Sequence, residues 1–176
     1  MTRFNDCLAF TIGPSIEGGI SNYSADRGGL TNYGITQITY DRYRIAQGLP
    51  QQPASMATIP EAQAIYLTYY WTPAQCGAMP APVDLCMFDM TVNSGLGNAS
   101  KNLQRALGVV VDGVIGPATL AAVAAGDPMS TAASFIDLRD AFYKQIVVND
   151  PSQGIFLNGW LNRDNALRTA CGLPVS

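Results

Sequence analysis

Residues 17–36 read EGGISNYSADRGGLTNYGIT and separate a short apolar segment from the rest of the chain. The segment before the stretch, residues 4–17, carries apolar side chains at roughly helical period, and Gly18-Gly19 is a helix stop signal. Pro14 lies inside the segment, so we expect a kink or a restart of the helix there. The stretch itself is rich in Gly, Asn and Ser with short β-prone pieces, which favours a small irregular hairpin.

Downstream of this stretch the apolar pattern predicts helices. Thr36 can cap a helix that runs to about Gln47, and Thr58 with Glu61 resembles a capping box for a helix that ends near Trp71. Further helices are expected at 82–93, 98–107, 117–125, 130–148 and 158–170. The predicted fold class is therefore mainly α, with a small N-terminal β-hairpin lobe and a helical C-terminal lobe.

The composition restricts the chemistry that the chain can perform. Of 176 residues only 13% are charged, about half of the ~25% in an average domain, and there is no histidine. A Ser-His-Asp triad, a Cys-His pair and a His-ligated zinc site are therefore excluded. Acid–base chemistry must use carboxylates, Tyr, Lys or Cys, and the chain has only two glutamates.

These two glutamates differ in how well local structure explains them. Glu61 is accounted for by the capping box, whereas Glu17 ends a predicted helix, where the helix dipole disfavours a negative charge. Such a position suits a carboxyl group that stays protonated near neutral pH, although a solvated helix-end glutamate is the alternative. Asp26 follows nine residues later, and two carboxyl groups facing each other suit the cleavage of a glycosidic bond. The alternative for Asp26 is a turn residue or an ion pair with Arg27.

Charge and hydropathy argue against two classes of partner. Both halves of the chain are weakly acidic, so neither carries a basic surface for nucleic acid. No stretch approaches the ~20 apolar residues of a membrane span. The N-terminal apolar run is too short for a signal peptide, which predicts a cytoplasmic start unless another system exports the product.

Four cysteines, at positions 7, 76, 86 and 171, form no CxxC pair. A four-thiolate zinc site is not favoured at this spacing, and buried reduced thiols are expected in a cytosolic chain. Cys76 and Cys86 are close enough in sequence to pair if the protein reaches an oxidising compartment.

A set of ordered motifs covers nearly the whole chain. They are Glu17-Gly18-Gly19, the block from Asp26 to Thr36, Ile65-Tyr66, Tyr70-Trp71, Phe88-Asp89, Val92-Asn93-Ser94-Gly95, Leu103-Gln104, the run from Asp112 to Thr119, and Gly159 to Arg163. Together they resemble glycoside hydrolase family 108, lysozyme-like N-acetylmuramidases found as phage endolysins and in bacterial secretion or lysis loci. The resemblance implies a lysozyme-like α+β fold, with a catalytic region over 1–88 and a helical, peptidoglycan-binding region over 89–176 in one compact two-lobed unit.

The resemblance also implies catalytic roles. Glu17 matches the catalytic glutamate of the family's EGG motif and would act as the general acid, with Asp26 as the second carboxylate. Phage lysozymes more broadly space Glu, Asp and Thr by eight and then five residues. Here five residues after Asp26 lead to Asn32, with Thr31 one place early, so Thr31 and Thr36 are both candidates for the threonine role.

Five residues are expected to bind substrate, and each has a structural alternative. Asn93 can bind an acetamido group or cap a turn, and the aromatic residues can stack on sugars or belong to the core. The five residues are Asn32, Tyr33, Tyr70, Trp71 and Asn93. Asp112 is expected to have a structural role in a turn, and Arg163 to tie the last helix to the fold.

The expected function is hydrolysis of the β-1,4 bond between N-acetylmuramic acid and N-acetylglucosamine in peptidoglycan, without a cofactor or metal. A lytic transglycosylase on the same fold, or a non-catalytic wall-binding or secretion-accessory protein, is the alternative. We expect a monomer whose partner is the glycan strand. The resemblance to endolysins predicts that the protein waits in the host cytoplasm until it is released to the cell wall.

Overall fold

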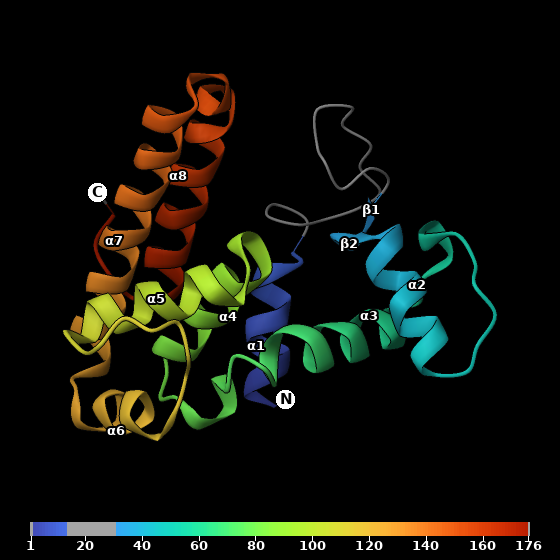
Figure 1. The fold of residues 1–176 in the computed structure, drawn as a ribbon, viewed down its shortest axis with the longest axis horizontal. Coiled ribbons are helices and arrows are strands. Elements are labelled where there is room, and N and C mark those ends of the chain that lie inside the picture. The colour runs from blue at the N-terminus through green and yellow to red at the C-terminus, as the bar shows by residue number, and fades with distance from the viewer. Residues whose placement is uncertain (1, 14–30, 176) are drawn as a thin grey trace. The chain divides into compact units, whose positions relative to one another are not determined.

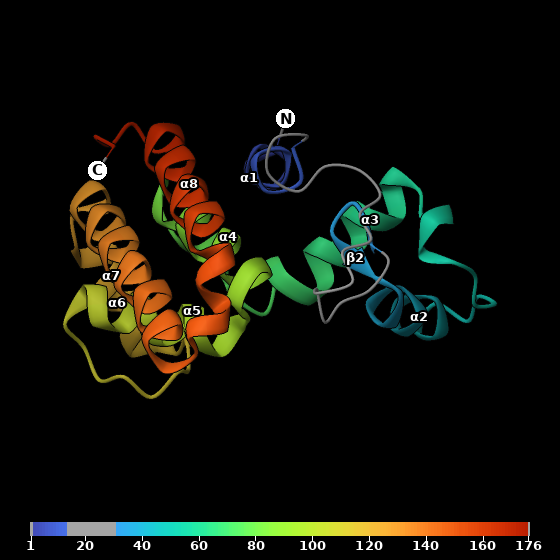
Figure 2. The same ribbon diagram turned by 90° about the horizontal axis from the view of Figure 1, so that it is seen from above.

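The computed structural model describes residues 2–13 and 31–175, and the chain divides into two compact units. Unit 1 is Met1–Trp71 and unit 2 is Thr72–Ser176. Figures 1 and 2 show the helices of both units in two views. Among the described residues, no helix combines the length and apolarity needed to cross a membrane.

Unit 1 combines short helices with one small hairpin. Its described elements are α1 (Arg3–Thr11), β1 (Thr31–Asn32), β2 (Ile35–Thr36), α2 (Gln37–Ala46), the 3-10 turn η1 (Ala54–Met56), α3 (Ile59–Tyr66) and the π-helical turn η2 (Leu67–Trp71). The two strands are antiparallel, with Thr31 opposite Thr36 and Asn32 opposite Ile35. The predicted hairpin is thus present, although most of the stretch that precedes β1 lies outside the described residues.

The starts of α2 and α3 follow the predicted caps. The Thr36 side chain accepts a hydrogen bond from the Thr39 backbone N–H, and α2 ends at Ala46. Thr58 and Glu61 form the reciprocal bonds of a capping box. Both predictions are confirmed, because a cap depends on residues that are neighbours in sequence.

The regular secondary structure in the described part of unit 2 is all helical. Its elements are the 3-10 turn η3 (Cys76–Ala78), α4 (Val83–Ser94), α5 (Leu96–Leu107), α6 (Pro117–Ala125), α7 (Pro128–Asn149), the 3-10 turn η4 (Pro151–Gln153) and α8 (Gly154–Ala170). Helices α7 and α8 lie side by side and α4 packs against α5 and α7 (Figures 1 and 2). Every residue from 83 to 91 of α4 is buried, so this helix forms the centre of the unit.

The mainly α class is confirmed, and the differences concern helix ends. Helix α1 ends at Thr11, before Pro14, where the sequence predicts a kink or a restart; the predicted continuation to residue 17 lies outside the described residues. Helix α8 starts four positions before the predicted residue 158, directly after η4. The predicted boundary between residues 88 and 89 falls inside α4. The assignment of separate functions to 1–88 and 89–176 stays a prediction.

Candidate active site and substrate surface

The predicted carboxylates Glu17 and Asp26 lie outside the described residues. The described part of the predicted site consists of the hairpin that follows them, Tyr70 and Trp71 in η2, and Asn93 in unit 2.

The hairpin turns through Tyr33 and Gly34, which both have positive φ angles, 54° and 73°. Two consecutive residues with positive φ make a type I′ turn, whose twist matches that of antiparallel strands. Glycine adopts this conformation freely, but a tyrosine there costs about 1–2 kcal/mol. The Tyr66 hydroxyl donates a hydrogen bond of 2.7 Å to the Tyr33 carbonyl oxygen. Helix α3 therefore holds the strained turn in place.

Asn32 anchors the hairpin on its other side. The side chain is buried, and its Nδ2 group donates to the carbonyl oxygens of Ser55 and Ala57 at 3.3 and 3.4 Å. These bonds connect β1 to η1 and the residue that follows it. The Asn32 amide donors are thus engaged by backbone groups of unit 1.

Of the two threonine candidates, Thr36 has a hydroxyl that serves the fold. It accepts from the Thr39 N–H at 3.3 Å and donates to the Thr39 hydroxyl at 3.1 Å. Thr31 lies opposite it in the strand pair, where its backbone is described but its side chain is not. The role of either threonine in water positioning stays a prediction.

The aromatic candidates of unit 1 differ in exposure. Trp71 is buried, and its ring meets the Phe4 ring edge-on at a centroid distance of 5.5 Å. Tyr70 and Tyr33 are half-buried, and the Tyr70 ring is tilted against the Tyr66 ring at 5.3 Å. The structure thus brings Tyr66 into contact with both the hairpin turn and Tyr70. Tyr33 and Tyr70 present more surface to a ligand than Trp71 does.

The Glu61 carboxylate accepts hydrogen bonds from three residues. Its carboxylate accepts bonds from Arg44 at 2.7 Å, from the Tyr40 hydroxyl at 3.0 Å, and from the Thr58 N–H and hydroxyl at 2.9 Å each. Burial by itself would raise the pKa of Glu61, but the hydrogen bonds from Thr58, Arg44 and Tyr40 outweigh it and lower the pKa to about 2. Glu61 is therefore ionised at neutral pH and cannot donate a proton to a leaving group.

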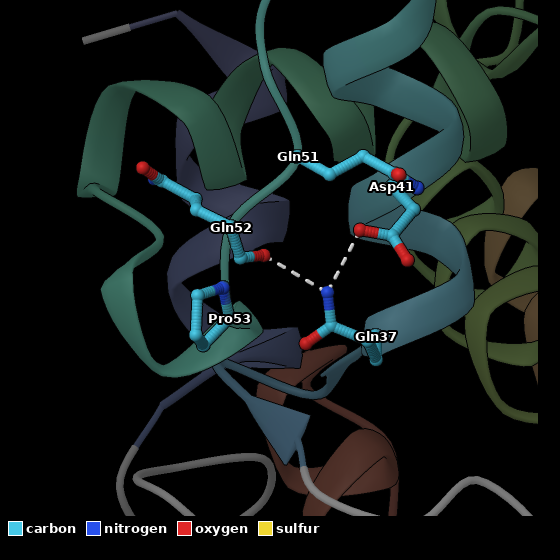
Figure 3. Close-up of a pocket in the computed structure, with 5 residues that line it drawn as sticks. All are labelled: Gln37, Asp41, Gln51, Gln52 and Pro53. Carbon is cyan, nitrogen blue, oxygen red and sulfur yellow. Dashed lines mark hydrogen bonds between the residues drawn. The ribbon is translucent and has the colours of Figure 1, made fainter.

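A polar hollow of about 330 Å³ lies beside the start of α2 (Figure 3). Its lining residues are Gln37, Asp41, Gln51, Gln52 and Pro53. The Gln37 amide donates to the Asp41 carboxylate at 2.8 Å and to the Gln52 carbonyl at 2.9 Å, and it accepts from the Ala54 N–H. The polar atoms of Gln37 therefore fix the loop between α2 and η1.

Asn93 is the predicted substrate residue of unit 2, and it is exposed near the end of α4. Its Oδ1 atom accepts hydrogen bonds from the hydroxyls of Tyr143 and Ser94. Within residues 2–13 and 31–175, its Nδ2 group donates no hydrogen bond. The side chain is thus oriented by α7 while its two N–H donors remain available to a ligand.

A buried cluster of charged side chains connects α4 to α7 and α8. Asp89 accepts from Arg139 of α7 and from Arg163 of α8, both at 2.7 Å, and Asp89 and Arg139 have no exposed surface. Burial would raise the pKa of Asp89, but the charges of Arg139 and Arg163 outweigh it and the pKa lies below its ordinary value. The prediction that Arg163 ties the last helix to the fold is confirmed.

The run that starts at Asp112 has the predicted structural role. The Asp112 carboxylate accepts from the Val114 N–H at 2.8 Å and from the Gln104 amide at 2.6 Å. The Gln104 Oε1 atom in turn accepts from the Gly113 N–H at 2.8 Å. These bonds fasten the turn to α5.

Three supporting residues were not predicted from sequence. Tyr66 holds the hairpin turn, Tyr143 orients Asn93, and Arg139 pairs with Asp89. Tyr66 lies within one of the family motifs, so the sequence marked it as relevant, but no local pattern indicated that its hydroxyl binds Tyr33. Tyr143 and Arg139 had no signal, because their partners are 50 positions away.

Comparison with known proteins agrees with the motifs and the fold. The family model described as glycosyl hydrolase 108 matches residues 12–95, and the model described as predicted peptidoglycan domain matches residues 98–165. A search of curated proteins found no match. Among solved structures, Brucella abortus SagA is 30% identical, with a TM-score of 0.80 over 96% of this chain and 92% of that chain. The glycosyl hydrolase 108 match and the match to a peptidoglycan domain together support a glycoside hydrolase that degrades peptidoglycan. The chain therefore belongs to the glycosyl hydrolase 108 family.

Proposed function

We propose that the chain is an N-acetylmuramidase that hydrolyses the β-1,4 bond between N-acetylmuramic acid and N-acetylglucosamine. The observation that carries the proposal is the glycosyl hydrolase match over residues 12–95, which includes both Glu17 and Asp26. The remaining glutamate, Glu61, is held ionised in a capping box. Glu17 is therefore the glutamate left for proton donation.

In this mechanism Glu17 protonates the glycosidic oxygen as the bond breaks. Asp26 stabilises the oxocarbenium-like transition state, acts as nucleophile, or positions the attacking water. Thr31 or Thr36 positions water or substrate. Tyr66 and Asn32 act through the hairpin, because both hold the backbone from which Thr31 and Tyr33 extend.

The chain offers a matched test of the acid, since it has two glutamates. We expect Glu17→Gln to lower the rate of peptidoglycan hydrolysis by about 100-fold or more, because a general acid contributes ~10²–10⁴-fold. Glu61→Gln serves as the control and should keep the rate within a few-fold once folding is checked by circular dichroism. Equal hydrolysis by wild type and Glu17→Gln would refute the assignment of Glu17.

Mass spectrometry of the released muropeptides separates hydrolysis from its nearest alternative. Reducing ends on N-acetylmuramic acid support the muramidase, whereas 1,6-anhydro ends identify a lytic transglycosylase. Asp26→Asn tests the second carboxylate in the same assay, and undiminished activity would refute the two-carboxylate mechanism. Peptidoglycan binding by wild type without any release of fragments would instead support a wall-binding accessory protein.

The geometry of the Asn93 side chain supports a role in binding an N-acetyl group of the substrate. Its exposed Nδ2 donors suit the carbonyl oxygen of an N-acetyl group, and Tyr143 fixes the orientation of the amide. We expect Asn93→Ala to raise KM on N-acetylated peptidoglycan several-fold and to change activity on de-N-acetylated glycan much less. Asn158→Ala, on exposed α8 surface, is the control. An equal loss on both glycans would argue against recognition of the acetyl group.

The proposed biological role is cell-wall lysis after release from the host cytoplasm, as in endolysins. Peptidoglycan lies outside the cytoplasmic membrane, so an enzyme made inside the cell needs a route across it. Expression in bacteria should therefore cause lysis only when a membrane-permeabilising agent or pore is supplied. Lysis without permeabilisation would indicate an export route of its own.

A further inference from the structure

Two cysteine sulfurs that are 85 positions apart in sequence meet inside unit 2. Cys86 lies in the middle of α4, and Cys171 is the C-cap residue of α8. Their Sγ atoms are 3.7 Å apart, and both side chains are buried. Sequence proximity favoured Cys76 as the partner of Cys86, whereas the structure places the sulfur of Cys171 beside it.

We propose that Cys86 and Cys171 are a redox pair, which holds two thiols in a reducing compartment and a disulfide in an oxidising one. A disulfide needs its sulfur atoms ~2.05 Å apart, so the two atoms must approach by less than 2 Å. Cys171 follows the last residue of α8 and precedes Gly172, which has a φ of 71° and ends the helix. The end of a helix adjusts to such a movement more easily than the centre of a buried helix.

Both thiols are buried, but they differ in exposure. The hydrogen bond with Cys171, followed by burial, raises the pKa of the Cys86 thiol well above its ordinary value. Cys171 is 7% exposed and Cys86 is not exposed at all. Cys171 is therefore the thiol that meets an external oxidant first, and Cys86 completes the bond from inside.

The oxidant is a small-molecule or protein disulfide. The Cys171 thiol loses its proton to solvent, and the thiolate attacks one sulfur of that disulfide, which forms a mixed disulfide and releases the other sulfur as a thiolate that takes up a proton. Cys86 then loses its proton to solvent and attacks Cys171 Sγ, which expels the second thiolate. Two protein thiols are oxidised by two electrons, and the external disulfide is reduced to two thiols.

The bond would connect the centre of α4 to the end of α8. Helix α4 also carries Asp89 and Asn93, so the cross-link would reinforce the helix that positions both. A disulfide that closes a long loop restricts the unfolded chain and raises the unfolding temperature. The inference goes beyond the proposed function and does not depend on muramidase activity.

The test uses the full chain, refolded from denaturant in glutathione buffers that are either strongly reducing or strongly oxidising. Remaining thiols are alkylated, and peptides are mapped by mass spectrometry without reduction. The oxidised sample should yield one cross-linked peptide pair containing Cys86 and Cys171, and it should unfold several degrees higher than the reduced sample. Dithiothreitol should reverse both changes.

Cysteine variants show which pair is responsible. Cys86→Ser and Cys171→Ser should each lose the cross-linked peptide and the redox dependence of the unfolding temperature, whereas Cys7→Ser, in unit 1, should retain both. Complete alkylation of Cys86 and Cys171 in oxidising buffer would overturn the proposal. So would a dominant cross-link between any other two cysteines, or equal unfolding temperatures of oxidised and reduced wild type. The wild-type mapping decides the question even if a variant fails to fold.

Discussion

Charged side chains support both units, but their surroundings differ. In unit 1 the ion pair between Arg44 and Glu61 is partly exposed, with side-chain exposures of 12% and 15%. In unit 2 the pair between Arg139 and Asp89 has no exposed surface, and Arg163 completes it from α8. The first pair lies at the start of α3, whereas the second connects α4, α7 and α8.

The difference indicates how strongly the stability of each unit depends on its charged side chains. An exposed ion pair contributes little and costs little to lose, because water replaces the missing partner. A buried pair contributes modestly as a whole, but removing one member leaves the other charged group without compensation in a place that water does not reach. Unit 2 should therefore respond to single charge changes far more strongly than unit 1.

The largest effect should come from Asp89→Asn. This change removes the carboxylate that the buried Arg139 and Arg163 share, while Arg139 keeps Asp164 at 3.0 Å, and we expect the free energy of unfolding to fall by about 3–5 kcal/mol. Urea unfolding followed by Trp160 fluorescence, in a Trp71→Phe background, reports on unit 2. Asp137→Asn is the control, because Asp137 pairs with Arg168 but is 70% exposed. Equal losses of unfolding free energy in both variants would show that buried and exposed ion pairs contribute alike.

The second effect is a pH dependence of unit 2. Burial raises the pKa of Asp164 to about 8, the charge of Arg139 opposes this rise, and the neighbouring Asp140 carboxylate adds to it. The folded state therefore keeps a proton that an unfolded aspartate releases near pH 4. The contribution of Asp164 to the free energy of unfolding is thus fully present below pH 4 and is lost as the pH rises to about 8. We expect a loss of roughly 2 kcal/mol between pH 5 and pH 8, less than the full linkage of one proton.

Asp164→Asn tests this pH dependence directly, since an amide has the same shape and does not titrate. The variant should show a flatter stability profile between pH 5 and pH 8 in the same urea assay. A wild-type profile that rises with pH across this range would contradict the assignment.

A smaller effect should follow from Glu61→Gln in unit 1. The change removes the ion pair with Arg44 and weakens the capping box, and we expect a loss of about 1–2 kcal/mol. Because the pKa of Glu61 is about 2, the wild-type contribution is present above its ordinary pKa near 4.5 and is lost as the pH falls through 2. Thermal unfolding of wild type and variant at pH 7 and pH 2 should therefore differ at pH 7 and converge at pH 2.

The smallest effect should come from Tyr66→Phe. The variant loses only the hydroxyl that binds the Tyr33 carbonyl, which is worth about 1 kcal/mol. Backbone amides of the hairpin should exchange with solvent faster, while those of α7 remain unchanged. Tyr69→Phe, which keeps its ring over Arg42, is the control, and equal exchange in both variants would remove Tyr66 from its supporting role.

The sequence predicted local features well because their causes are local. The caps at Thr36 and at Thr58 with Glu61, and helix α6 over residues 117–125, depend on residues within a few positions of one another. Helix α1 ends at Thr11, shortly before Pro14, where the sequence predicted a kink or a restart. The turn at Tyr33 was not predicted in detail, since tyrosine seldom adopts a positive φ.

The sequence by itself determined the fold class, the family resemblance, and the restriction of acid–base chemistry to very few carboxylates. Only the tertiary structure decided which distant groups meet: Tyr66 with the Tyr33 carbonyl, Asp89 with Arg139 and Arg163, and Cys86 with Cys171. The physical reason is that periodicity and capping record contacts within one or two helical turns, whereas these partners lie 33 to 85 positions apart and are brought together by packing of the core.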